Sequence, residues 1–181
     1  EPLSKPYPFI CAHYDTVFST VGAHDNASGV AVALKLADSF AEEKKCRFAF
    51  FDGEEINKAG STDFVAKEKQ SLKNISFVLE IDAVGNGTEI ALLCSKQLYK
   101  KLLGLEARFN EELSKNHKVT ISRQSKIGFS DVWPFMKEDV PVIRMLTRKG
   151  CTKELMHTPE DTVDKIDEEL LLSVLKISRI I

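Results

Sequence analysis

The chain has 181 residues, of which 43% are hydrophobic and 29% are charged, with a formal net charge of −2. This length and composition exclude a disordered chain and are typical of a globular protein with a buried core. No basic cluster favours a nucleic-acid partner, and no apolar run is long enough to span a membrane. We therefore expect a single domain over residues 1–181, without repeats or low-complexity linkers.

Four cysteines bear on the cellular compartment, and their spacing shows no pairing: Cys11, Cys46, Cys94 and Cys151. We interpret them as free, buried thiols rather than disulfides or metal ligands. Residues 1–8 lack the basic start and apolar core of a signal peptide. Both features favour a cytoplasmic location. A secreted mature form, whose signal has been removed, is the alternative.

The first predicted strand covers residues 9–12 and ends at His13-Tyr14-Asp15. His13 and Asp15 are two residues apart, so on an extended chain they share a face. Such a pair suits metal binding, because the carboxylate can accept the second ring N–H and select the tautomer. Taken alone, however, the tripeptide more often marks a surface histidine near a turn.

A loop of small and polar residues follows at 22–29 and leads into a helix predicted over residues 30–41. Asn26 or Ser28 is the expected cap of this helix. Its apolar positions recur at helical spacing and are Val30, Ala33, Leu34, Ala37, Phe40 and Ala41. Asp25 is either a simple cap or a carboxylate that bridges two metal ions.

The second predicted strand, at 47–51, is a short apolar run that stops at Asp52-Gly53 and is followed by Glu54 and Glu55. The carboxyl end of a buried strand is where ligands usually bind in α/β sheets. Two carboxylates there repel each other unless a positive charge lies beside them. A solvated turn is the alternative interpretation.

The remaining elements continue the alternation of strand and helix. Strands are predicted at 75–81, 89–94, 118–123 and 141–146. Helices are predicted at 59–69, 97–113, in the second half of 128–137, and at 167–181. The stripe Leu98, Leu102, Leu105, Phe109 and Leu113 indicates core packing. The order predicts an α/β fold, a mostly parallel mixed sheet sandwiched between helices.

Two further candidate ligands stand in this part of the chain. Asp82 follows the strand at 75–81, and His157 lies in the turn at 156–162. The set of candidates is then His13, Asp25, Glu55, Asp82 and His157. Mixed imidazole and carboxylate donors suit Zn²⁺ better than Ca²⁺ or Mg²⁺. Five donors exceed one tetrahedral catalytic zinc but suit two if one carboxylate bridges, and Glu54 is left over as a general base.

These motifs, in this order over nearly the whole chain, resemble the di-zinc aminopeptidases of the M28 type. The most specific pieces are the loop Gly22-Ala23-His24-Asp25-Asn26-Ala27-Ser28-Gly29 and the pair Glu54-Glu55 with Gly60-Ser61. The resemblance implies the same α/β fold and hydrolysis of peptides from the amino end. It also implies two Zn²⁺ ions per chain, for which Co²⁺ or Mn²⁺ could substitute.

The resemblance further implies a role for each site residue. His13 and Asp82 would bind one zinc, Glu55 and His157 the other, and Asp25 would bridge them. Glu54 would be the general base, and Asp15 would orient His13. A cis peptide bond between Asp25 and Asn26 is also implied.

The chain departs from the family pattern at three points. Val132 stands where relatives often have His after the Ser-Asp that matches Ser130-Asp131, and Met156 offers no hydroxyl to an oxyanion. Relatives usually carry more helix and strand before the first metal strand, so a missing sheet edge or a truncated chain is expected. Phe129, Trp133 and Phe135 either line an apolar pocket or belong to the core.

Three other functions stay open. A glutaminyl cyclase shares the fold but uses one zinc. The carboxypeptidase-like M20 relatives share the His-x-Asp and Glu-Glu pattern but usually insert a second domain. A catalytically inactive binding domain keeps the fold but usually loses ligands or the base. The sequence leaves the preferred side chain and the oligomeric state open.

Overall fold

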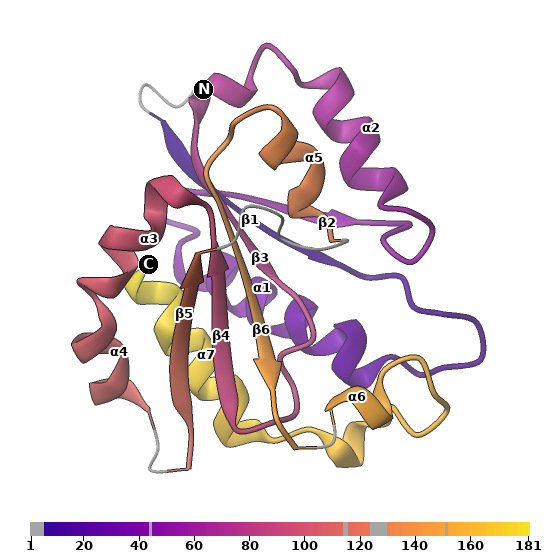
Figure 1. Ribbon diagram of the computed structural model, residues 1–181. Coiled ribbons are helices and arrows are strands. Elements are labelled where there is room, and N and C mark those ends of the chain that lie inside the picture. The colour runs from indigo at the N-terminus through magenta and orange to yellow at the C-terminus, as the bar shows by residue number, and fades with distance from the viewer. Residues whose placement is uncertain (1–5, 44, 114–115, 124–129, 151) are drawn as a thin grey trace.

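The computed structural model describes residues 6–43, 45–113, 116–123, 130–150 and 152–181. One six-stranded sheet forms its centre, with the strand order β2-β1-β3-β6-β4-β5 (Figure 1). The strands are β1 (Tyr7–His13), β2 (Arg47–Phe51), β3 (Ile75–Ile81), β4 (Glu89–Cys94), β5 (Lys118–Arg123) and β6 (Val142–Arg148). The predicted bounds of β2 to β5 are confirmed to the residue, whereas β1 and β6 are longer than predicted.

The pairing confirms a mostly parallel mixed sheet. Strands β2, β1, β3 and β6 are mutually parallel, β4 runs antiparallel to β6, and β5 is parallel to β4. After β1 the chain forms β2 on one side of β1 and then crosses over to form β3 on the other side of β1. This reversal of strand order creates a crevice at the carboxyl end of β1, where open α/β sheets bind ligands.

Helices cover both faces of the sheet, which confirms the predicted sandwich (Figure 1). One face packs against α1 (Ser28–Ser39), α3 (Lys96–Leu103), α4 (Glu106–Glu112) and α7 (Glu168–Ile180). The other face packs against α2 (Ala59–Lys67) and α5 (Val132–Lys137). The helix α6 (Thr152–Leu155) and the single turns η1 (Ala23–Ala27), η2 (Leu72–Asn74) and η3 (Val163–Lys165) were not predicted, because such short elements carry little periodicity.

Side chains alternate between the two cores along each central strand. In β1, Phe9 and Cys11 belong to the core under α2 and α5, whereas Ile10 and Ala12 belong to the core under α1 and α7. A parallel strand that is buried on both faces reads as a continuous apolar run. β1 and β3 are strands of this kind, whereas β2 lies at the edge of the sheet and is mostly half-buried.

The buried face of α1 differs from the predicted stripe. Val32 and Leu36 are buried together with Ala33, whereas Leu34 is 54% exposed. The helix begins at Ser28, and its inward face includes Gly29, where a Cβ would lie 2.3 Å from the carbonyl oxygen of Ile81. This close approach sets the rotation of the helix, so the residues spaced three and four after Gly29 turn inward.

The segment predicted as one helix over 97–113 is two helices, because α3 ends at Leu103 and α4 begins at Glu106. Gly104 lies at the break, and glycine weakens a helix interior. The stripe itself is confirmed as core packing. Leu102 and Phe109 are fully buried, and the other members pack against them.

Three of the four cysteines are described, and they are free thiols as predicted. Cys11 and Cys94 are buried, whereas Cys46 is half-buried. Cys151 lies outside the described residues. Within the described part of the chain, no helix combines the length and apolar character that crossing a bilayer requires.

Candidate metal centre

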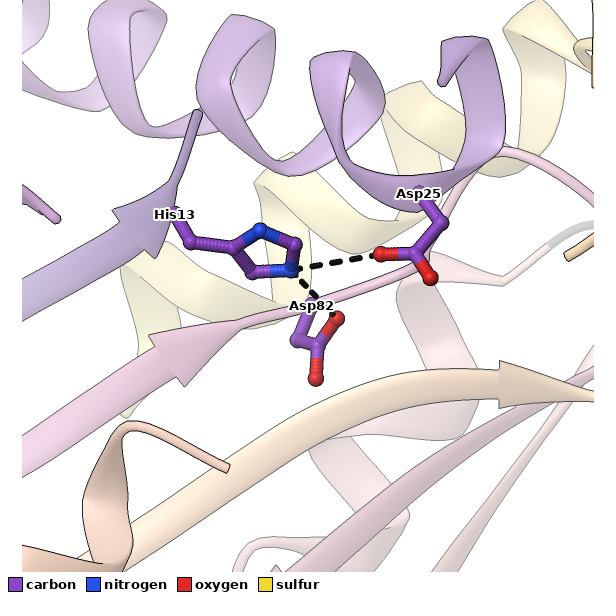
Figure 2. Close-up of side chains that lie close together, drawn as sticks. All are labelled: His13, Asp25 and Asp82. Carbon is purple, nitrogen blue, oxygen red and sulfur yellow. Dashed lines mark ion pairs between the residues drawn. The ribbon is translucent and has the colours of Figure 1, made fainter. Parts of the chain in front are cut away.

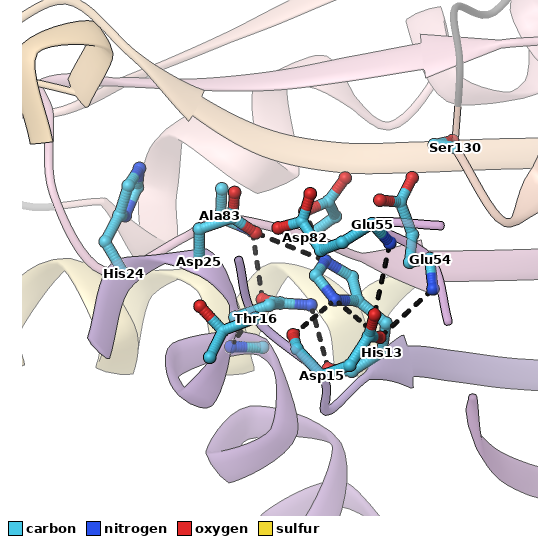
Figure 3. A network of polar contacts seen from close by, with 12 residues as sticks. His13, Asp15, Thr16, His24, Asp25, Glu54, Glu55, Asp82, Ala83 and Ser130 are labelled. Atoms are coloured by element: carbon cyan, nitrogen blue, oxygen red, sulfur yellow. Dashed lines mark hydrogen bonds and ion pairs between the residues drawn. The ribbon is translucent and has the colours of Figure 1, made fainter. Parts of the chain in front are cut away.

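The predicted site residues converge on one edge of the sheet (Figure 3). His13 ends β1, Glu54 and Glu55 follow β2, and Asp82 follows β3. Because these three strands are parallel neighbours, their carboxyl ends meet. With Asp25 from η1 and His157 after α6, they surround a pocket of about 290 Å³, also lined by Asn57, Lys58, Arg144 and Met156.

The first donor group contains His13, Asp25 and Asp82 (Figure 2). The Nε2 atom of His13 lies 3.2 Å from Oδ1 of Asp25 and 3.4 Å from Oδ1 of Asp82. All three side chains are buried, with relative exposures of 1%, 4% and 2%. Three buried donor atoms therefore face a common point.

The second donor group contains Asp25, Glu55 and His157. The Nε2 atom of His157 lies 3.3 Å from Oδ2 of Asp25 and 3.3 Å from Oε2 of Glu55. Asp25 thus directs one oxygen to each group. His157 is the most exposed member, with 52% of its side chain accessible.

These donors fit zinc. Atoms bound to one zinc at about 2.0–2.1 Å with tetrahedral angles lie about 3.3–3.4 Å apart, and the observed separations are 3.2–3.4 Å. The second oxygen of Glu55, Oε1, is buried without a hydrogen-bond partner among the described residues. Carboxylates this close repel one another without a cation, and a buried unpaired oxygen is costly.

Asp15 holds the Glu54-Glu55 turn through its carboxylate. Its two oxygens accept hydrogen bonds from the backbone N–H groups of Glu54 and Glu55, each at 3.1 Å. The Nδ1 atom of His13 lies 3.1 Å from the backbone carbonyl oxygen of Asp15 and 3.5 Å from its carboxylate. The carbonyl is therefore the nearer partner of the ring, and the carboxylate joins the end of β1 to the turn after β2.

Asn26 joins three other segments of the site. Its amide nitrogen donates to the carbonyl of Ile81 at 3.0 Å, and its oxygen accepts from Ala83 N and Gly29 N. Asn26 thus bonds to the first turn of α1, but the N-cap residue is Ala27 and has no side-chain cap, so the expected cap at Asn26 or Ser28 is wrong. The peptide bond between Asp25 and Asn26 is cis, as the resemblance implied.

The charged groups perturb one another strongly. Burial lowers the pKa of His13, but hydrogen bonds and charges from Asp25 and Asp82 outweigh this effect and raise it to about 12. Burial, helped by the charge of Asp82, raises the pKa of Glu54 to about 7. A cation between these carboxylates would act in the opposite direction on both groups.

Two residues at the site form contacts that the sequence did not predict. Arg144 on β6 donates from Nε and an Nη atom to Oδ2 of Asp82, at 2.9 and 2.5 Å. Glu80 on β3 is fully buried; burial and then Asp82 raise its pKa to about 8, while Arg144 opposes this. Arg144 lies 62 residues after Asp82, so no local pattern joins them.

The aromatic residues after β5 do not line this pocket. Phe135 is fully buried and packs against Phe9, Phe51 and Phe64, with ring centroids 5.5–6.3 Å away. Trp133 is half-buried and lines a separate hollow beside α2. Phe129 lies outside the described residues. Ser130 instead contacts a residue next to the site: its hydroxyl donates a hydrogen bond to Oε2 of Glu80 at 2.6 Å.

Comparison with known proteins identifies the family of this chain. The model of peptidase family M28 matches residues 3–179. The chain belongs to peptidase family M28. Aminopeptidase YwaD of Bacillus subtilis strain 168 is 30% identical over 174 residues, which is 90% of this chain and 37% of that protein.

Solved M28 structures show the same fold. BSAP, a zinc aminopeptidase from Bacillus subtilis, superposes with a TM-score of 0.81 at 24% identity, over 96% of this chain and 44% of that chain. The aminopeptidase of Aneurinibacillus sp. strain AM-1 gives 0.79 at 27% identity, over 96% and 42%. The chain thus spans less than half the length of these relatives. Its family implies zinc at the centre.

Proposed function

We propose that this M28 chain is the catalytic domain of an aminopeptidase that uses two zinc ions, with Co²⁺ or Mn²⁺ as substitutes. One observation carries the proposal: the two oxygens of Asp25 face two separate donor groups. In this proposal His13 and Asp82 would hold one ion, Glu55 and His157 would hold the other, and Asp25 would be shared by both. The named aminopeptidases among the relatives support this assignment.

Glu54 is the proposed general base. It lines the pocket beside Glu55 but belongs to neither donor group. When bound, zinc lowers the pKa of water and polarises a substrate carbonyl. Glu54 accepts a proton from the attacking water and then gives it to the leaving amine. Burial raises the pKa of this carboxylate, which favours its protonation, whereas bound cations would oppose the effect.

The free carboxylate of the pocket favours the amino end of a peptide. Glu54 belongs to neither donor group, so its negative charge is available to attract a free ammonium group and to repel a terminal carboxylate. Arg144 is the arginine in the pocket, and two of its nitrogens are already bonded to Asp82. It is therefore poorly placed to clamp a peptide carboxylate. We therefore propose that the enzyme removes residues one at a time from the N-terminus of a peptide.

Metal analysis after zinc is added back tests the two-ion part of the proposal. We expect two zinc ions per chain in the wild type and one in His157→Ala. A wild-type protein that never exceeds one ion contradicts the proposal. Conversion of an N-terminal glutamine peptide to its cyclic product, without hydrolysis, would instead identify a glutaminyl cyclase.

A further inference from the structure

The turn that carries His157 is anchored by one buried carboxylate. Every residue from 156 to 169 is described, and within this stretch Asp161 alone is buried, with 1% exposure. The φ angle of His157 is 62°, in the left-handed region that is costly for residues with a Cβ. Such a conformation persists only where surrounding contacts hold it. The buried Asp161 lies four residues after His157 in the same turn, so its contacts can hold His157 in this conformation.

Asp161 contacts three consecutive N–H groups of η1. Its Oδ1 accepts from His24 N at 2.6 Å, and its Oδ2 accepts from Asp25 N at 3.0 Å. Its backbone carbonyl accepts from Ala23 N at 3.2 Å. The N–H of Asp161 in turn donates to the carbonyl of Thr158 at 3.2 Å, which closes the turn after His157. One residue thus joins the His157 turn to the backbone of the bridging ligand.

We infer that Asp161 is a positioning residue for the ion held by His157 and Glu55. The inference rests on the proposed two-zinc function. Asp161 acts through the backbone of Asp25 and through the turn that presents His157. Asp25 also has a second anchor in Asn26, which bonds to Ile81 at the carboxyl end of β3 and to Ala83 just after it. Loss of the Asp161 carboxylate therefore weakens the ion at His157 more than the ion at His13 and Asp82.

The variant Asp161→Asn keeps the size of the side chain but turns an NH₂ group towards one of the two N–H donors. We expect the affinity for the second zinc to fall about 10–100-fold, the effect typical of residues that orient metal ligands, with the first unchanged. Competition with a chromophoric zinc chelator measures both constants. Asp164→Asn is the control, because Asp164 is exposed and contacts Thr162 and Lys165. It should leave both constants unchanged.

A double-variant comparison separates positioning from general stability. His157→Ala retains one ion, so its zinc affinity is measured with and without Asp161→Asn. If Asp161 acts through His157, the second substitution adds nothing. A further loss of affinity for the remaining ion would show a general structural role and overturn the inference.

The outcomes for Asp161 and for the proposed function are distinct. A wild-type protein that binds a single zinc contradicts the two-zinc function itself. A wild type with two zincs and an Asp161→Asn variant with unchanged constants overturns only the inference.

If Asp161→Asn does not fold, the zinc-loaded wild type provides the test. The amide hydrogens of His24 and Asp25 should exchange slowly, because both are bonded to Asp161. Fast exchange at both positions would overturn the inference.

Discussion

Asp25 has the most constrained position in the centre. It is 4% exposed, it directs one oxygen to His13 and the other to His157, and its own N–H is bonded to Asp161. A buried carboxylate needs cationic partners, and each of the two histidines that face Asp25 also faces a second carboxylate. Two zinc ions would supply the positive charge. The position of Asp25 is therefore explained by both donor groups together and by neither group alone.

Glu54 is the residue whose replacement most directly affects catalysis. Glu54→Gln should leave zinc content unchanged, because Glu54 belongs to neither donor group. The turnover number should fall by about 10²–10⁴-fold, the usual contribution of a general acid–base group. Steady-state kinetics with metal analysis on the same sample measures both. Exposed Glu42→Gln is the control. A Glu54→Gln variant that keeps most of its turnover number would show that another group moves the proton.

At the scale of elements, the centre is built where loops leave a rigid sheet. The ends of β1, β2 and β3 are held in register by their pairing, whereas η1 and the turn at 156–162 are held by side chains such as Asn26 and Asp161. We therefore expect removal of the metal to increase the mobility of η1 and of the turn at 156–162, and to leave the ends of β1, β2 and β3 unchanged.

Removal of zinc by a chelator should raise amide hydrogen exchange in residues 22–29 more than in β3. Without cations, the carboxylates of Asp25, Glu55 and Asp82 repel one another, and Asp25 lies in this loop. Exchange followed by mass spectrometry, with and without zinc, measures the difference. Equal increases in the loop and in β3 would contradict the assignment of Asp25 as the shared ligand.

The start of β4 carries a pH-dependent contact away from the metal centre. Glu89 is buried and lies 3.0 Å from Lys149 and 3.6 Å from Lys118. Burial raises its pKa, but hydrogen bonds from Lys149 and Thr120 and the lysine charges outweigh this and lower it. The ionised carboxylate therefore stabilises the fold above the pKa of the unfolded chain, and this contribution is lost as the pH falls through the folded value.

Glu89→Gln should lower the melting temperature at pH 7, and the difference from wild type should close as the pH approaches 3. Thermal unfolding over this pH range measures this difference, with Glu112→Gln as the control, because Glu112 is an exposed residue of α4. A difference that stays constant with pH would show that the charge of Glu89 does not stabilise the fold.

At the scale of the whole molecule, strand order brings together residues that are far apart in sequence. The reversal of the chain about β1 places His13, Glu55 and Asp82 at one edge, although they span 70 positions. The described residues include both proposed donor groups and the proposed base. The chain nevertheless spans less than half the length of YwaD and BSAP.

His13, Glu55 and Asp82 could be predicted because each lies at or just after the end of a short apolar strand, which is a strong local signal. Asp25 and His157 were candidates by residue type alone, because their loops carry no periodicity, and the family resemblance then implied their roles. The contacts of Arg144, Glu80 and Asp161 were not predicted, because their partners lie 50 or more residues away in the sequence. The rotation of α1 was missed because Gly29 packs against the Ile81 carbonyl, a contact absent from any local pattern.

Release of free amino acids from matched peptides tests the central claim most directly. Zinc-loaded protein should release residues one at a time from a peptide with a free N-terminus and should leave the N-acetylated peptide intact. Glu54→Gln, with the same zinc content, should release almost none. Cleavage of the acetylated peptide from its C-terminal end, or no release by folded protein that holds two zinc ions, would contradict the account.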